Sequence, residues 1–430
     1  KIIRFPFIPH TSYPHEILHN WWGNWVYISP KSGNWAEGLT SYLSDHLLSE
    51  LKGKAERYRF RELTKYLNYV DKNSDFPLSE FSYRQDMASQ AIGYGKMLMV
   101  FHMLRNKIGN SAFIESLQNF YSTNQFQYAG FEELITSFET TTGKDLTLFW
   151  TQWTTRKGAP KLVLKSAKQS VSGLTHIINL ETAQAQTEEP FQFELPVGIW
   201  YYPQKNKEPL FKIQRIPLTK RQEMTTLKIP SKAGKILVDP YNDVFRKLDR
   251  YEVPPSIGQT FGAKNAKVYL PSNNVGLYTN IAQAFANNPE SILTAKDGET
   301  FPNESAWVLG IDNPLADKLK PQLDKLRIKI GDKTIKVEGK ELALDGISFA
   351  FTLINAKHPE HSVTWLVAGS EKAVPGLIRK LPHYGPFGYM VFEGDVPTNL
   401  ARGYWQPSKT GLEIEFLPGE YILPPAKPLV

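Results

Sequence analysis

The chain has 430 residues, of which 41% are hydrophobic and 13% aromatic, and its formal net charge is +7. This length and composition are typical of a folded protein of two to four domains. The absence of cysteine excludes disulfides, thiol catalysis and cysteine metal ligands. No apolar run reaches the roughly 18 residues that a membrane-spanning helix needs. The lysines are scattered and form no basic stripe, so we expect no nucleic-acid partner.

The most informative segment is HEILH, at residues 15–19. His15 and His19 are four positions apart, so on a helix both imidazoles lie on one face and can bind one metal ion. Glu16 lies beside the first histidine, where it can take a proton from a metal-bound water without binding the metal itself. This spacing is typical of a catalytic zinc site. A surface helix with two solvated histidines is the alternative interpretation.

A third zinc ligand has to come from another segment, because catalytic zinc keeps three protein ligands and an open position for water. The best candidate is Glu37 in the segment WAEGL, residues 35–39. Water bound to such a zinc ion has a pKa of about 7, so it can act as a nucleophile at neutral pH. The predicted cofactor is one Zn²⁺ per chain.

The segments HEILHNWWGN and WAEGL resemble the M1 aminopeptidases, which belong to the gluzincin zinc peptidases. That family typically reads HExxH, then W-x-G-N, then N-E-G with the third ligand. The resemblance implies that His15, His19 and Glu37 bind zinc and that Glu16 is the general base. The family also has a tyrosine in a Y-x-K-G context that stabilises the oxyanion. The matching Tyr94-Gly95-Lys96 makes Tyr94 the proposed oxyanion donor.

The resemblance covers about residues 11–160 and departs from the family pattern at several points. Ala36 replaces the usual asparagine before the third ligand, and Met97 replaces the glycine after the lysine. The family binds the free amine of its substrate with a G-x-M-E-N segment, and the 14 residues before His15 carry no such motif. We therefore expect a divergent fragment or a shortened relative.

Apolar residues recur at helical spacing through the first third of the chain. The expected helices cover residues 35–52, 55–68, 86–107, 111–122, 130–140 and 145–156. The first of them would present Glu37 from its first turn, and Gly38 would let another helix approach closely. The sequence thus predicts a helical, gluzincin or thermolysin-like catalytic domain at residues 1–158.

From residue 160 the pattern changes to short alternating segments that are typical of strands. The expected strands cover residues 161–164, 174–181, 191–202, 210–217, 224–229 and 235–238. They predict a β-sandwich at 159–252, followed by a proline-bearing linker at 251–256. Strands and helices then alternate, which predicts an α/β domain of unknown role with a partly parallel sheet at 257–430. The expected fold class is multidomain α+β.

Four tryptophans crowd the proposed zinc segments, namely Trp21, Trp22, Trp25 and Trp35. Aromatic residues at helical spacing are more often part of a core than of a substrate pocket, so we expect them to be packed. Asn24 and Asn34 are candidates for orienting the zinc ligands by hydrogen bonding.

These observations favour zinc-dependent hydrolysis of peptide bonds, most simply from the N-terminus, with a peptide as the partner. Two alternatives remain open. One is a non-catalytic binding or scaffold protein with a vestigial zinc site, and the other is a zinc endopeptidase. The sequence does not decide the oligomeric state. A periplasmic or secreted location is favoured over a cytoplasmic one.

Overall fold

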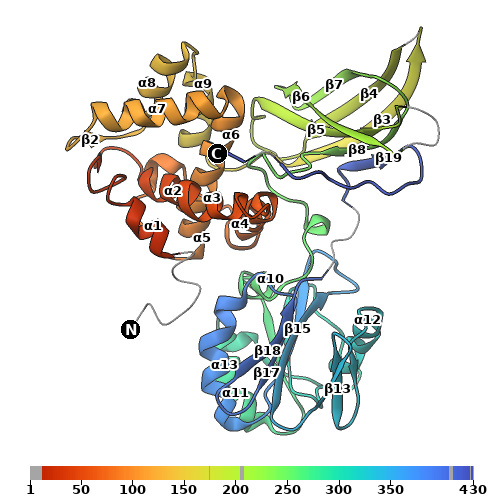
Figure 1. Cartoon of the computed structure of the whole chain (residues 1–430). Helices are drawn as coiled ribbons and strands as arrows, with labels where there is room; N and C mark the ends of the chain where they lie inside the picture. The colour runs from red at the N-terminus through yellow and green to blue at the C-terminus, as the bar shows by residue number, and fades with distance from the viewer. Residues whose placement is uncertain (1–11, 174, 204–207, 406–409, 427, 430) are drawn as a thin grey trace. The chain divides into compact units, whose positions relative to one another are not determined.

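The structure, a computed structural model, describes residues 12–173, 175–203, 208–405, 410–426 and 428–429. It divides into two units (Figure 1). The first contains the described residues up to Asp249 together with those from Thr410 onward, and the second runs from Arg250 to residue 409. Within the described ranges, no helix combines the length and the apolar character that crossing a bilayer requires.

A bundle of short helices opens the first unit, in red to gold in Figure 1. The α-helices are α1 (Ser12–Leu18), α2 (Ala36–Ser41), α3 (Leu47–Glu50), α4 (Ala55–Tyr69), α5 (Met87–Gln90), α6 (Met97–Ile108), α7 (Asn110–Thr123), α8 (Phe131–Thr142) and α9 (Thr147–Thr155). All six helical segments predicted between residues 35 and 156 are confirmed, with ends that shift by one or two residues. Helix α6 is the centre of the bundle, because every residue from Met97 to Arg105 is buried.

Two π-helical turns interrupt the helices that the sequence predicted to be continuous. The turn η3 (Tyr42–His46) joins α2 to α3, and the turn η5 (Ala91–Lys96) joins α5 to α6. A π turn inserts an extra residue into the helical path, changes the direction of the side chains beyond it, and often occurs at functional sites. Tyr94 lies in the second of these turns.

A close contact between α2 and the start of α6 depends on Gly38. A Cβ atom at this position would lie 2.3 Å from the Cβ of Met97 and 3.2 Å from the carbonyl oxygen of Gly93. Real side chains do not come this close, so only glycine allows the two helices to meet. This confirms the predicted close approach and places α2 against the segment that carries Tyr94.

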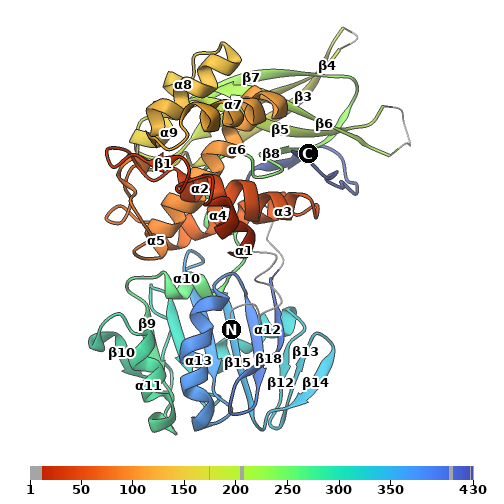
Figure 2. The ribbon, with the colours of Figure 1, turned by 60° about the vertical axis from the view of Figure 1, so that its left-hand side comes forward.

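The short strands β1 (Tyr27–Ile28) and β2 (Tyr128–Ala129) pair within the helical part. Among the described residues of the first unit, seven further strands form two antiparallel sheets. The strands are β3 (Leu162–Ser172), β4 (Thr175–Gln184), β5 (Phe193–Tyr201), β6 (Leu210–Leu218), β7 (Gln222–Ile229), β8 (Ala233–Val238) and β19 (Glu413–Glu415). One sheet has the order β3-β4-β7 and the other β19-β8-β5-β6. Figure 2 shows the first sheet lying over the second. The six predicted strands are all present, although residue 174 lies outside the described residues.

The last strand of this sheet comes from the C-terminal segment. Strand β19 pairs with β8 in antiparallel register, Glu413 opposite Leu237. The carboxylate of Glu413 also lies 2.7 Å from the ammonium group of Lys235. The predicted α/β domain of residues 257–430 is therefore too long, because the chain rejoins the first unit at Thr410.

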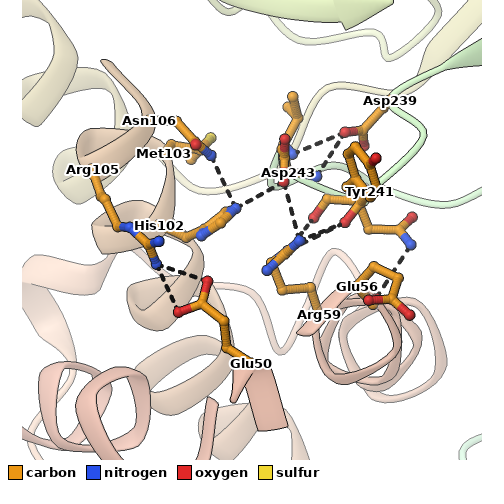
Figure 3. A network of polar contacts seen from close by, with 12 residues as sticks. Glu50, Glu56, Arg59, His102, Met103, Arg105, Asn106, Asp239, Tyr241 and Asp243 are labelled. Atoms are coloured by element: carbon orange, nitrogen blue, oxygen red, sulfur yellow. Dashed lines mark hydrogen bonds and ion pairs between the residues drawn. The ribbon is translucent and has the colours of Figure 1, made fainter. Parts of the chain in front are cut away.

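Buried charges connect the helices to the loop that follows β8, and Figure 3 shows this network. The carboxylate of Asp243 lies 3.1 Å from the Arg59 guanidinium and 2.9 Å from Nε2 of His102. Arg59 also donates to the carbonyl oxygens of Tyr241 and Asn242. Since a buried charge is costly unless it is paired, these contacts hold the helical and β-stranded parts of the unit together.

The second unit is an α/β arrangement built on a seven-stranded sheet, in the order β10-β9-β11-β16-β15-β17-β18. Strands β10, β9, β11 and β16 are parallel neighbours, whereas β15, β17 and β18 are antiparallel. These strands are β9 (Lys267–Leu270), β10 (Ile292–Thr294), β11 (Ala306–Leu309), β15 (Ile347–Ile354), β16 (Ser362–Val367), β17 (Tyr389–Glu393) and β18 (Thr398–Gly403). The predicted partly parallel sheet is confirmed.

Both faces of this sheet are covered, which explains why β11 and β16 are buried along their whole length. Helices α10 (Ile257–Phe261), α11 (Val275–Phe285) and α13 (Val374–Lys380) pack on one face. The other face is covered by α12 (Lys320–Lys325) and by a small sheet of β12 (Lys329–Ile330), β13 (Thr334–Val337) and β14 (Lys340–Ala343). The mixed α+β class is thus confirmed, while the thermolysin-like character of the helical part stays a prediction.

The buried network predicts how stability depends on pH. Burial, together with the charge of Arg59, lowers the pKa of His102 from 6.5 to about 4. Below pH 6.5 the unfolded chain binds a proton at this histidine that the folded chain does not bind, so stability decreases as the pH falls. The loss is on the order of 1–2 kcal/mol between pH 6.5 and 5.

We expect His102→Gln to remove this contribution, whatever its effect on stability at neutral pH. Urea unfolding at pH 6.5 and 5 measures the difference for both proteins. His176→Gln, on strand β4, is the control. An equal pH-dependent loss in the wild type and in His102→Gln would contradict the assignment.

Candidate metal centre

Three side chains that the sequence singled out converge at one point. His15 lies on α1, His19 follows the end of that helix, and Glu37 lies in the first turn of α2. The Nε2 atoms of His15 and His19 are 3.4 and 3.3 Å from Oε2 of Glu37. Ligand atoms of the three residues all lie within 4.8 Å of one another, and this is the one such cluster of histidines and acids in the described residues.

The other ring nitrogen of each histidine is held by an acceptor. Nδ1 of His15 lies 3.1 Å from Oδ2 of Asp45, in the turn η3. Nδ1 of His19 lies 3.0 Å from the carbonyl oxygen of Trp22. These acceptors favour the tautomer with hydrogen on Nδ1, which leaves the Nε2 lone pairs facing the centre of the cluster. Histidine ligands in metal sites are usually oriented in this way.

The electrostatics of the cluster indicate that it favours positive charge. Burial acts to lower the pKa of His15, but hydrogen bonds to Asp45 and Glu37 raise it to about 9. Burial also acts to raise the pKa of Glu37, but hydrogen bonds to the two histidines lower it to about 2. The hydrogen bond to Glu37 raises the pKa of His19. Two nitrogen lone pairs and one carboxylate around a point suit a cation there, which protons or a metal ion can supply.

The donor set fits a zinc ion. Two imidazole nitrogens and one carboxylate oxygen are the three-ligand set of thermolysin-type catalytic zinc, with a fourth position open for water. Hard cations such as Mg²⁺ and Ca²⁺ prefer oxygen ligands alone. The two Nδ1 acceptors complete the arrangement that such histidines normally have.

The backbone around Glu37 is also held in place. Oδ1 of Asn34 accepts hydrogen bonds from the backbone N–H groups of Ala36 and Glu37, at 3.1 and 3.4 Å. These bonds satisfy two of the free N–H groups that begin α2, and so fix the turn from which Glu37 projects. Asn34 thus supports the turn of Glu37 through the backbone, and a role for it in orienting the zinc ligands stays a prediction.

Tyr94 and Glu16 lie at the same cavity. The ring of Tyr94 stacks on that of His15, with centroids 6.2 Å apart, and its hydroxyl interacts with the Glu37 carboxylate. Burial and the charge of Glu37 raise the pKa of Tyr94, so its hydroxyl keeps its proton. Glu16 projects from α1 into the same space and is solvent-exposed.

The cavity has a volume of about 690 Å³, which is large enough for several residues of a peptide. The three proposed ligands, Glu16 and Tyr94 all contribute to its wall. Other polar residues line it as well, namely Asp45, Glu62, Lys65, Arg84 and Gln90. The sequence analysis therefore singled out the residues at the centre of this cavity, but it did not predict these other polar lining residues.

The sequence did not identify Asp45, and its position explains why. In a regular α-helix a residue eight positions after Glu37 is rotated by about 80° from it. The π turn η3 changes this path, and both carboxylates reach His15. The helical periodicity of the sequence does not indicate such a turn.

The prediction that the four tryptophans are packed is only partly confirmed. Trp22 and Trp35 are buried, but Trp21 and Trp25 are 43% and 37% exposed.

Comparisons with known proteins support the resemblance that the motifs indicated. Residues 12–153 match the peptidase family M1 domain, so the M1 resemblance is confirmed for this part of the chain. The alanine/arginine aminopeptidase of Saccharomyces cerevisiae is 26% identical over 182 residues, which is 41% of this chain and 21% of that protein. The mitochondrial aminopeptidase 2 of the same yeast is 25% identical over 184 residues, covering 41% and 19%.

A solved structure is also similar to part of the chain. It is Legionella pneumophila aminopeptidase A in complex with aspartic acid, with a TM-score of 0.39 and 17% identity, covering 63% of this chain and 29% of that one. This chain spans only about a fifth of the length of the yeast relatives.

The contact between Asp45 and His15 leads to a prediction about metal affinity. Removing a hydrogen-bond partner of a metal-binding histidine typically weakens metal binding by about 10- to 100-fold. We expect Asp45→Asn to weaken zinc binding by this factor while the fold is kept, as measured by competition with a chromogenic chelator. Asp71→Asn, in the loop after α4, is the control. Unchanged zinc affinity in Asp45→Asn would show that Asp45 does not orient His15.

Proposed function

Because residues 12–153 match the peptidase family M1 domain, we propose that this chain is part of a zinc metallopeptidase that hydrolyses peptide bonds from the N-terminus. The observation that carries the proposal is the convergence of His15, His19 and Glu37 in a cavity that also holds Glu16 and Tyr94. The two yeast relatives, both named as aminopeptidases, support the choice of the N-terminus.

In this proposal His15, His19 and Glu37 hold the zinc ion. Zinc bound there would lower the pKa of a water molecule and polarise the scissile carbonyl. Glu16 is exposed to the cavity and does not take part in the ligand cluster, so its carboxylate is free to take a proton from the attacking water. It then returns that proton to the leaving amine.

Tyr94 supplies the second chemical function. Its hydroxyl keeps its proton, because burial and the neighbouring Glu37 raise its pKa. It can therefore donate a hydrogen bond to the carbonyl oxygen of the substrate as negative charge develops there. A positioned donor of this kind typically contributes about 3 kcal/mol to the stability of the transition state.

Two other functions remain as alternatives. A vestigial, non-catalytic site has no need of a base and an oxyanion donor, so the presence of Glu16 and Tyr94 beside the ligands argues against it. An endopeptidase would use the same zinc chemistry and differ only in substrate binding. The periplasmic or secreted location stays a prediction.

Glu16→Gln tests the role of the base. The amide keeps the shape of the side chain but cannot accept the proton, so we expect peptide turnover to fall by at least about 100-fold. Zinc content should stay at the wild-type level, because Glu16 is not a ligand in the proposal. Glu115→Gln, an exposed position on α7, is the matched control. If Glu16→Gln kept its peptide turnover, this would contradict the proposed role of Glu16 as the general base.

A panel of peptides separates the aminopeptidase from the endopeptidase. Pairs that differ only in an acetyl group on the N-terminus are incubated with the zinc-loaded chain, and the products are identified by mass spectrometry. Cleavage of the free-amine peptide alone supports the aminopeptidase. Cleavage of both at internal bonds supports the endopeptidase.

A further inference from the structure

The basic side chains that line the cavity differ in whether they have a partner within the chain. His15 and His19 both contact carboxylates of the metal centre. Lys65 donates to both oxygens of the Glu62 carboxylate, each at 2.9 Å. These three side chains are thus committed to interactions within the chain, and a substrate would have to displace a partner to pair with any of them.

Arg84 is the exception. Its side chain lines the cavity from the loop before α5 and is exposed. Among the residues that the structure describes, its guanidinium makes one polar contact, 3.8 Å to the sulfur of Met87, which is a weak acceptor. Within the described ranges of the chain, no carboxylate lies within 4 Å of it. The cavity therefore offers one guanidinium whose hydrogen-bond donors are largely available to a bound molecule.

The position of this guanidinium relates it to the reacting bond. Arg84 and Tyr94 line the same cavity. A substrate seated with its scissile carbonyl near Tyr94 would therefore have its side groups in the cavity that Arg84 also lines.

A carboxylate is the group that best suits this arrangement. The planar guanidinium can donate two parallel hydrogen bonds to one carboxylate, which adds direction to the charge attraction. Peptides carry a carboxylate beside a scissile bond in two ways. It belongs either to an aspartate or glutamate side chain or, in a dipeptide, to the free C-terminus.

We propose that Arg84 makes this site selective for peptides with a carboxylate next to the scissile bond. This inference rests on the proposed peptidase function and adds a substrate class to it. Arg84 acts as a specificity residue, because it contacts the substrate and takes no part in the proton transfers.

Peptide binding, measured apart from turnover, tests the proposal. The Glu16→Gln protein serves as a trap that binds peptides without cleaving them, and calorimetry gives the dissociation constants. One pair of peptides compares an N-terminal glutamate with glutamine, with both C-termini amidated. A second pair compares a dipeptide that has a free C-terminus with its amide. The two pairs separate the two sources of carboxylate.

We expect at least one pair to show about a fivefold preference for the carboxylate at low salt, which is the upper range for a solvent-exposed ion pair. The preference should decrease as salt is added, because exposed charges are screened. In Glu16→Gln/Arg84→Met, which keeps the side-chain length and removes the charge, the ratio should fall to about one. Arg84→Lys should keep part of it.

Lys144→Met, an exposed cation that does not line the cavity, is the control and should keep the full preference. Equal affinities within both pairs, or a preference that survives in the Arg84→Met protein, would overturn the proposal. These binding measurements test the role of Arg84 independently of the proposed peptidase function. If the chain with Glu16 intact cleaves no peptide, the proposed function fails, whichever way the binding ratios turn out.

Discussion

The arrangement of the first unit depends on the pairing of buried charges around Asp243. This carboxylate enters the helical bundle from the loop after β8 and meets Arg59 and His102 there. Removing one partner of a buried ion pair typically costs about 3–5 kcal/mol, because the other charge is left without compensation. The loop and the helices are thus bound to each other by a requirement of electrostatics as well as by apolar packing. Arg59 extends the network further, because its NH1 lies 2.7 Å from Nε2 of His46 in the turn η3.

The turn η3 connects this network with the metal centre. His46 faces Arg59, while its neighbour Asp45 faces His15. The side chain that orients a proposed zinc ligand is therefore carried by a turn whose next residue is fixed by the buried charges. A metal site needs ligands held close to their bound geometry before the ion arrives, and support from surrounding packing provides this. A contact that begins in the β-stranded part of the unit thereby contributes to the order of a helical site.

The sequence predicted those parts of the molecule that depend on local pattern. The spacing of His15 and His19, the WAEGL segment and the Tyr94 motif identified the central residues of the cavity. Helical and strand periodicity located the main elements. It failed where the determinant is non-local: the pairing of Asp243 with His102 spans 141 residues, and β19 is a three-residue strand that carries no usable period. The π turns were missed for a related reason, because packing and not periodicity decides where a helix takes an extra residue.

The central claim is that the first unit holds one catalytic zinc ion through His15, His19 and Glu37. The most direct measurement is the zinc content of the purified chain by elemental analysis, before and after incubation with zinc and gel filtration, in parallel with His19→Ala. The account predicts about one zinc per chain in the wild type and a clear loss in the variant. A chain that holds no zinc after reconstitution, or a variant that holds as much as the wild type, would contradict it.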